Sequence, residues 1–258
     1  MSLDTAPALR AEGVALRYAG AAQPVLSAFD LSLSQGEIVA VLGPSGVGKS
    51  SLLRILAGLE PPSAGQVLVG GAPLTAPHPR VAIAFQDPSL LPWLTLEKNV
   101  AFGLDFRHQP RLDRQQRQSR VQAAIAEVGL GDARHRYPAQ LSGGMAQRAA
   151  LARCLARNPE VLLLDEPFGA LDEVTRAEMQ RLLLKIVADL RTATLLITHD
   201  IDEALQLADR VLLLGGAPAR IVGDWTVALA KPRDETDNDL AALRLEILRS
   251  LRAAIHRH

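Results

Sequence analysis

Cysteine is nearly absent from this chain of 258 residues, and its scarcity excludes two ways of stabilising a fold. Cys154 is the only cysteine, so no disulfide can form within the chain and no cluster of thiolates can hold a metal ion. The six histidines do not pair with cysteines or carboxylates at the spacing of a zinc site. We therefore expect neither a disulfide framework nor a structural zinc site.

Aromatic residues, an excess of one charge and long apolar runs are also missing. Only 3% of the residues are aromatic, and 28 Lys and Arg balance 28 Asp and Glu. Nucleic-acid binders usually carry a basic excess or aromatic stacking platforms, so we expect no nucleic-acid partner. No apolar run reaches the ~20 residues of a membrane span, and the first seven residues lack a signal-peptide pattern. We expect a cytosolic protein that touches a membrane only through partners.

The chain does contain enough apolar sequence, 48% of its residues, to build one large or two small domains. Several short runs are apolar at nearly every position, which is typical of strands buried on both faces. These runs are residues 38–42, 81–85, 161–164, 194–198 and 211–214. Helix-like stretches such as 49–57 and 176–190 lie between them. The pattern predicts an α/β fold with a mainly parallel core sheet.

The two ends of the chain and one internal stretch differ from this core. Residues 14–18 and 31–34 alternate apolar and polar side chains, which predicts an N-terminal antiparallel β layer. Strand signals vanish from about residue 88 to residue 137, and we expect a helical insertion over about residues 88–158. Residues 1–230 would then form one domain, followed by a linker and an amphipathic helix in residues 231–258.

The expected C-terminal helix has an apolar stripe with two possible roles. The stripe could pack on its own domain, or it could make a regulatory or dimer contact. Its residues are Leu240, Leu243, Ile247, Leu248, Leu251 and Ile255.

The buried run 38–42 leads into a glycine-rich loop that is typical of a phosphate site. The loop fits G-x-x-x-x-G-K-[ST], in which backbone N–H groups and the start of a helix face phosphate oxygens. It consists of Gly43, Pro44, Ser45, Gly46, Val47, Gly48, Lys49 and Ser50. This pattern predicts that Lys49 contacts the β- and γ-phosphates and that Ser50 binds Mg²⁺.

Polar residues also follow three other buried runs. Asp165 and Glu166 end the run 161–164, where one carboxylate can hold Mg²⁺ and the other can polarise the water that attacks a γ-phosphate. Gln86 follows the run 81–85, and His199 follows the run 194–198. In α/β folds, ligands bind at the carboxyl edge of the sheet, so we expect these residues at one site.

A second helix start suited to anions follows at residues 141–148, with Ser142 as a good N-cap before Gly143 and Gly144. With this turn in place, the chain resembles the ATP-binding-cassette (ABC) ATPases over residues 9–222, and the turn corresponds to the signature motif of that family. The resemblance implies that two copies meet head to tail, each signature turn covering the ATP held by the other copy. It further implies a P-loop NTPase fold with a helical subdomain.

The resemblance assigns a role to each candidate site residue. Catalysis would involve Glu166, His199, Gln86 and Lys49, and Mg²⁺ would be held by Ser50, Gln86 and Asp165. ATP would contact Tyr18, residues 43–51 including Ser51, the signature residues Ser142, Gly143 and Gly144, and Asp172 of the D-loop, with Tyr18 stacking on the adenine. Gly169 stands where serine is common in the D-loop.

Three segments look more specifically like the ATPase subunits of nitrate, taurine and aliphatic-sulfonate importers: residues 85–95, 141–148 and 231–251. The signature variant in residues 141–148 looks closest to the aliphatic-sulfonate branch. The expected function is therefore ATP hydrolysis coupled to import of a small anion. The implied partners are a second copy, integral membrane permease subunits and, indirectly, a substrate-binding protein, at the cytoplasmic face of the inner membrane. Trp93, beside Leu90, Leu91 and Leu94, either receives a helix of the permease or anchors the helical insertion.

Two other functions fit the sequence less well. A non-transport ABC ATPase of chromosomes or ribosomes would need a long coiled coil or two cassettes in one chain, and the sequence has neither. A small-molecule kinase with the same phosphate loop would not need the turn at residues 142–144. Within the importer class, nitrate, taurine or another small molecule remains an alternative cargo.

Overall fold

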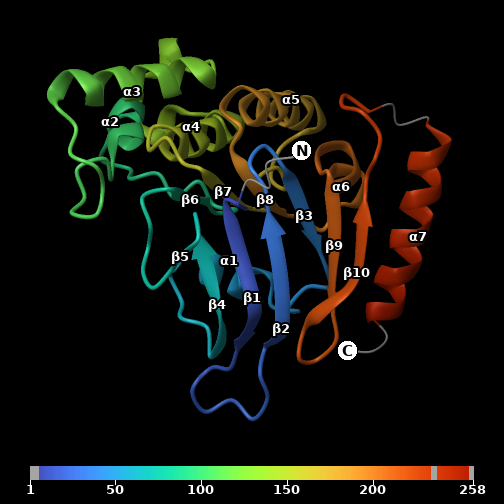
Figure 1. Ribbon diagram of the computed structural model, residues 1–258. Helices are drawn as coiled ribbons and strands as arrows, with labels where there is room; N and C mark the ends of the chain where they lie inside the picture. Colours follow the sequence, from blue (N-terminus) through green and yellow to red (C-terminus); the bar gives the residue numbers. More distant parts are fainter. Residues whose placement is uncertain (1–5, 234–236, 256–258) are drawn as a thin grey trace, which may run out of the picture. The chain divides into compact units, whose positions relative to one another are not determined.

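The computed structural model describes residues 6–233 and 237–255 (Figure 1). The chain forms two compact units. The chain up to Pro77 and from Ala193 onwards builds the first unit, and residues His78–Thr192 build the second. None of the helices in the described ranges is long and apolar enough to cross a membrane.

The first unit contains an antiparallel sheet made largely by the start of the chain. Its strands are β1 (Leu9–Leu16), β2 (Leu26–Leu33), β4 (Ala64–Val69) and β5 (Ala72–Pro73), in the order β2-β1-β4-β5. Every pairing is antiparallel, as the alternation near the N-terminus predicts. Strands β4 and β5 have no counterpart among the strands predicted from the sequence.

The first unit also holds the strands that carry the glycine-rich loop and His199. Strand β3 (Ile38–Leu42) pairs in parallel with β8 (Ala193–Ile197) on one side and with β9 (Arg210–Gly215) on the other. All five residues of β3 are buried, which explains its uninterrupted apolar sequence. Strand β10 (Arg220–Thr226) pairs antiparallel with β9. Helix α1 (Lys49–Leu56) follows β3, and helix α6 (Ile201–Leu207) follows β8.

The second unit combines two parallel strands with most of the helices. Strands β6 (Val81–Ala84) and β7 (Val161–Asp165) pair in register from Val81 with Val161 to Ala84 with Leu164. The helices are α2 (Leu96–Ala101), α3 (Arg114–Glu127), α4 (Gly143–Leu155) and α5 (Glu173–Leu190), with two 3₁₀ turns, η1 (Gly131–Ala133) and η2 (Pro138–Gln140). Residues 88–158, all of them described, form helices and turns without a strand.

The C-terminal helix α7 (Asn238–Ile255) runs alongside β10 and packs against β9, β10 and α6 of its own unit (Figure 1). Of the apolar stripe, Leu240 and Ile247 are buried, whereas Ile255 is 51% exposed. Ala254 takes the inward position instead, and it lies so close to β9 that a Cβ built on Gly215 would be 2.9 Å from the Ala254 Cβ.

Candidate active site

The loop between β3 and α1 requires glycine at several positions. Gly46 and Gly48 have φ angles of 80° and 108°, in the left-handed region that favours glycine. A Cβ on Gly48 would lie 2.8 Å from Val25 Cγ1, and a Cβ on Gly43 would lie 2.9 Å from the carbonyl oxygen of Leu214. The loop is therefore a tightly curled backbone that side chains would fill, as a phosphate cradle must be.

Lys49 and the start of α1 complete this cradle. Lys49 is only 8% exposed, and its Nζ donates hydrogen bonds to the carbonyl oxygens of Gly43 (2.8 Å) and Pro44 (3.1 Å). The N-cap residue of α1 is Gly48, so no side chain caps the first backbone N–H groups of the helix. Uncapped N–H groups, the positive end of the helix dipole and a lysine together fit the phosphates of a nucleotide.

Two further predicted residues of the first unit lie near this loop or on the same sheet edge. The Tyr18 hydroxyl and the Ser51 Oγ are 3.0 Å apart and share a hydrogen bond, which places the exposed Tyr18 side chain beside α1. His199 directly follows Thr198 at the end of β8, the parallel neighbour of β3. The next residue, Asp200, caps α6 by accepting hydrogen bonds from the N–H groups of Asp202 and Glu203.

The carboxylates and Gln86 come from the second unit. Asp165 ends β7 and Glu166 follows it, and Gln86 comes two residues after the end of the neighbouring β6, so the parallel strands bring all three to one edge. Glu166 has a φ of 44°, which is unusual for a residue with a side chain. Its carbonyl oxygen accepts a hydrogen bond from the N–H of Gly169 (3.3 Å), within the tight turn that follows the strand. Backbone strain of this kind is often found at functional sites.

The signature turn and Asp172 are joined through Thr175. Ser142 caps α4 by accepting a hydrogen bond from the N–H of Met145 (3.3 Å). Gly144 is buried, and a Cβ there would lie 2.4 Å from Thr175 Cγ2. Thr175 donates its N–H (3.0 Å) and its hydroxyl (2.7 Å) to the carboxylate of Asp172, the N-cap of α5. These bonds lower the pKa of Asp172 and keep its carboxylate ionised.

Thr175 is a residue that the sequence analysis missed. An aspartate followed three residues later by a hydroxyl residue, just before a helix, is a recognisable capping pattern, and this pattern could have identified Thr175 from the sequence.

The predicted Mg²⁺ ligands come from both units: Ser50 from the first, and Gln86 and Asp165 from the second. Their joint role stays a prediction, as do the catalytic roles assigned to Lys49, Gln86, Glu166 and His199.

Two features define an ATPase with the P-loop NTPase fold. One is the glycine-rich loop between a buried parallel strand and a helix, and the other is the pair of carboxylates at the end of another buried strand. A family model described as "ABC transporter" matches residues 26–169. The chain belongs to this ABC transporter family.

Curated relatives cover nearly the whole chain. The aliphatic sulfonates import ATP-binding protein SsuB 2 of Burkholderia lata is 49% identical over 87% of this chain and 80% of its own length. The taurine import ATP-binding protein TauB of Chromobacterium violaceum is 45% identical over 93% of this chain and 94% of its own length. The bicarbonate transport ATP-binding protein CmpC of Synechococcus elongatus is 45% identical over 82% of this chain and 32% of its own length.

A solved structure supports the fold. The ATP-binding cassette MJ0796, in a dimeric post-hydrolysis state bound to ADP and Pi, aligns with a TM-score of 0.75 and 28% sequence identity, over 86% of this chain and 100% of that chain. The predicted fold class and the predicted ATPase class are therefore confirmed.

Proposed function

We propose that this ATPase energises an importer of aliphatic sulfonates. The observation that carries the proposal is its similarity to the aliphatic sulfonates import protein of Burkholderia lata over most of both chains. The relative named for taurine supports the same cargo chemistry, because taurine is itself an amino-substituted sulfonate.

The proposed reaction is in-line attack of water on the γ-phosphorus of ATP. A bond forms between the water oxygen and phosphorus, the bond from phosphorus to the β–γ bridging oxygen breaks, and Glu166 accepts the proton that the water loses. His199 contacts the γ-phosphate, Lys49 contacts the β- and γ-phosphates, and Tyr18 stacks on the adenine.

Magnesium fits the donor set proposed for it. A hydroxyl from Ser50, an amide oxygen from Gln86 and a carboxylate from Asp165 are the hard oxygen ligands that Mg²⁺ prefers alongside phosphate oxygens. When bound, the ion neutralises phosphate charge. The described residues contain no group of three or more His, Cys, Asp or Glu that could hold a metal ion.

Two copies of the chain would enclose two ATP molecules. The residues Ser142, Gly143 and Gly144 of one copy would cover the nucleotide held by the other, with Asp172 close to the same interface. ATP would then contact both copies only in the closed dimer, so that it binds the closed state more tightly than the open state. Hydrolysis removes this differential affinity and lets the dimer reopen.

Permease subunits in the membrane would meet the segment around Trp93. Trp93 is 69% exposed, which argues against the alternative that it anchors the helical insertion. The chain would be peripheral, at the cytoplasmic face of the inner membrane, and a substrate-binding protein would act through the permease.

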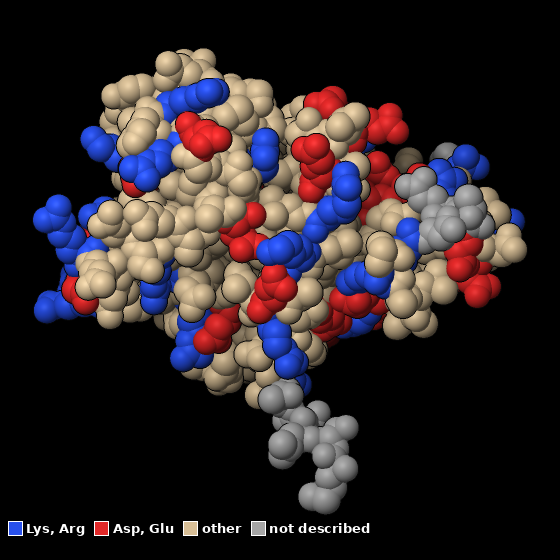
Figure 2. Space-filling view, turned by 90° about the horizontal axis from the view of Figure 1, so that it is seen from above, with Lys and Arg blue, Asp and Glu red and all other residues tan. Residues whose placement is uncertain are grey.

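Figure 2 shows Lys and Arg interspersed with Asp and Glu on one face of the molecule. The expected absence of a nucleic-acid partner stays a prediction.

Growth of a deletion strain tests the cargo. The gene is deleted in its host, and growth is measured with sulfate, an alkanesulfonate or taurine as sole sulfur source, and with nitrate or ammonium as sole nitrogen source. Failure confined to the alkanesulfonate, restored by the wild-type gene but not by a Glu166→Gln copy, supports the proposal. Failure confined to taurine or to nitrate assigns that cargo instead, and growth on every source refutes the proposal.

A further inference from the structure

The segment between β6 and α2 is held in place by a side chain of the signature helix. Arg153, on α4, donates one guanidinium N–H to the carbonyl oxygen of Pro88 (2.8 Å) and another to that of Ser89 (2.9 Å). Two parallel donors on one planar group fix both the position and the orientation of these two peptide units. Ser89 itself has a φ of 45°, and its N–H is bonded to Asp87 Oδ1 (2.6 Å).

The same segment is held at its other end by Asn99 of α2. The Asn99 side chain is fully buried, accepts the N–H of Leu91 (2.7 Å), and donates to the carbonyl oxygens of Leu91 (3.1 Å) and Leu94 (3.0 Å). Trp93 lies between these two attachments, with its side chain turned to solvent. The exposed tryptophan is therefore presented by a backbone that the protein fixes on both sides.

Helix α4 is bonded to the strand before this segment as well. The thiol of Cys154 donates to the carbonyl oxygen of Ile83 in β6 (3.3 Å). Burial raises the pKa of Cys154 to about 11, so the thiol keeps its proton and remains a donor near neutral pH. Arg157, just beyond the end of α4, donates to the carbonyl oxygen of His78, before β6 (3.2 Å). The C-terminal part of α4 and the residues just after it thus carry donors for the backbone around β6.

The N-terminal end of α4 carries the signature turn. At about 1.5 Å per residue, Arg153 lies about 15 Å along the helix from Gly143. A helix transmits a displacement of one end to the other because its internal hydrogen bonds resist bending. We infer that Arg153 is a positioning residue that couples the signature turn to Trp93, so that movement of residues 142–144 upon ATP binding is passed to the segment 87–95. This inference rests on the proposed function, in which the signature turn meets the ATP of the other copy.

Trp93 can report on its own displacement. The chain has two tryptophans, so a Trp225→Phe variant leaves Trp93 as the sole indole fluorophore. In a Trp225→Phe, Glu166→Gln background, which is expected to bind ATP without hydrolysing it, acrylamide quenching and emission of Trp93 are measured with and without MgATP. Calorimetry measures ATP binding, and light scattering measures dimer formation, in the same samples.

The expected result is a nucleotide-dependent change in Trp93 quenching that is lost in Arg153→Ala, while ATP still binds and the dimer still forms. Arg153→Lys should restore part of the response, because an ammonium can reach one carbonyl but lacks the planar pair of donors. Arg157→Ala is the matched control. It removes a similar bond to a backbone carbonyl but leaves the Pro88 and Ser89 carbonyls bonded, so the response should persist.

The outcomes separate this inference from the function on which it rests. If the reference protein binds no ATP or forms no dimer, the proposed function fails and the inference fails with it. If ATP binds and the dimer forms, the inference is overturned by the absence of a Trp93 response in the reference or by an unchanged response in Arg153→Ala. It is also overturned if Arg157→Ala loses the response equally. Should Arg153→Ala fail to fold, Arg153→Lys decides by the size of its response.

Discussion

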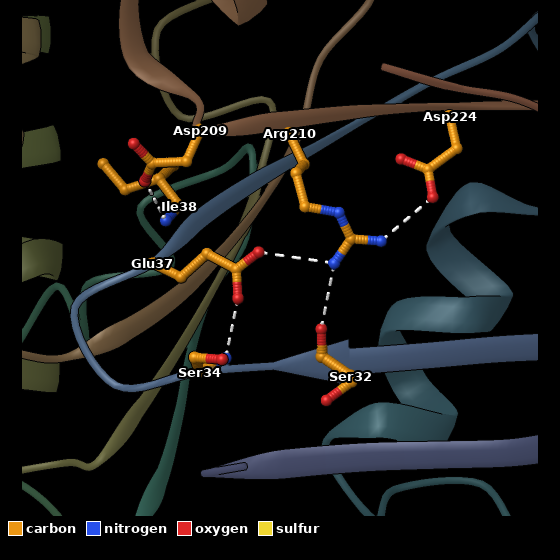
Figure 3. A network of polar contacts seen from close by, with 7 residues as sticks. All are labelled: Ser32, Ser34, Glu37, Ile38, Asp209, Arg210 and Asp224. Atoms are coloured by element: carbon orange, nitrogen blue, oxygen red, sulfur yellow. Dashed lines mark hydrogen bonds and ion pairs between the residues drawn. The ribbon is translucent and has the colours of Figure 1, made fainter. Parts of the chain in front are cut away.

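The two ends of β3 lie only five residues apart but differ in the groups that surround them: a glycine-rich loop at one end and a network of charged side chains at the other. At the carboxyl end, the chain passes into a loop in which glycines admit close approaches and Lys49 donates to two carbonyls of its own loop. At the amino end, charged side chains form a network in which the partners shown are all supplied by the protein (Figure 3).

Glu37 and Arg210 are the centre of that network. Glu37 accepts from the N–H of Ser34 (2.8 Å) and pairs with Arg210 (3.3 Å), which also reaches Asp224 (3.0 Å) and the carbonyl oxygen of Ser32 (3.2 Å) (Figure 3). These contacts tie β9 to the end of β2, to β10 and to the turn before β3. Asp209 adds a bond to the N–H of Ile38 (2.8 Å).

This difference separates stability from function. Charged groups that already have hydrogen-bond and ion-pair partners within the protein stabilise the fold and leave few donors or acceptors for a ligand. A curled, glycine-rich backbone contributes less to stability but can approach a phosphate closely. Substitutions at the amino end should therefore affect the stability of the fold but not ATP binding, whereas those at the carboxyl end should affect ATP binding.

The largest expected effect is that of Glu166→Gln, at the residue that follows β7. Loss of the proton acceptor should lower the rate of ATP hydrolysis by about 10²–10⁴-fold while ATP binding is retained. Phosphate release and equilibrium binding measure the two properties separately. Glu173→Gln, which neutralises an exposed carboxylate in the first turn of α5, is the control and should hydrolyse ATP normally. Normal turnover in Glu166→Gln would refute the assignment of the base.

The second expected effect distinguishes two glycines of the loop. Gly43→Ala places a Cβ against a backbone carbonyl and should lower both ATP affinity and the free energy of unfolding, the latter by about 1–3 kcal/mol. Gly46→Ala meets no atom within 4 Å and should carry only the backbone cost of a positive φ, about 1 kcal/mol. Urea denaturation and ATP titration of both variants test this, and equal stability of Gly43→Ala and wild type would contradict the steric argument.

The third expected effect is at the amino end, in Arg210→Ala. This change leaves Glu37 and Asp224 without their shared cation and should lower the free energy of unfolding by about 1–3 kcal/mol. The turnover of the folded protein and its KM for ATP should stay at the wild-type values. Thermal unfolding and ATPase assays on the same preparation test the separation. A large rise in KM without loss of stability would show that the two ends of β3 are not independent.

The smallest expected effect is that of Tyr18→Phe. Only the exposed hydrogen bond to Ser51 is lost, so the KM for ATP should change by no more than about twofold. Tyr18→Ala removes the ring as well and should raise KM more, by about the 1–3 kcal/mol of a stacked base. Equal KM values for the two variants would contradict adenine stacking by Tyr18.

Sequence reasoning located strands where burial on both faces leaves an uninterrupted apolar run. Each of the five predicted runs is a strand whose ends differ from the prediction by one residue at most. These runs are residues 38–42, 81–85, 161–164, 194–198 and 211–214. It missed β10, which alternates exposed and half-buried residues and contains Gly223 and Asp224, residues disfavoured in strands. Strand β5 has only two residues and leaves no periodic signal.

The candidate site likewise contains some residues that the sequence alone identifies and others that it does not. Contiguous motifs such as the loop 43–50 can be read from the sequence because neighbouring residues supply the chemistry. Arg153 and Asn99 could not be found in this way, since they bind backbone carbonyl and N–H groups that any sequence would present. For Arg153 the acceptors are 64 and 65 positions away, so only the tertiary structure reveals them.

The burial of Cys154 also determines how the protein responds to thiol chemistry. Burial raises the pKa of the Cys154 thiol to about 11, so the thiol is protonated near neutral pH, and its side chain is shielded from solvent. The native chain should therefore be inert to maleimides and mild oxidants under ordinary conditions. A cysteine introduced at an exposed position such as Ser45 or Ser142 would be the sole reactive thiol, so spectroscopic labels can be attached site-specifically without first removing the native cysteine.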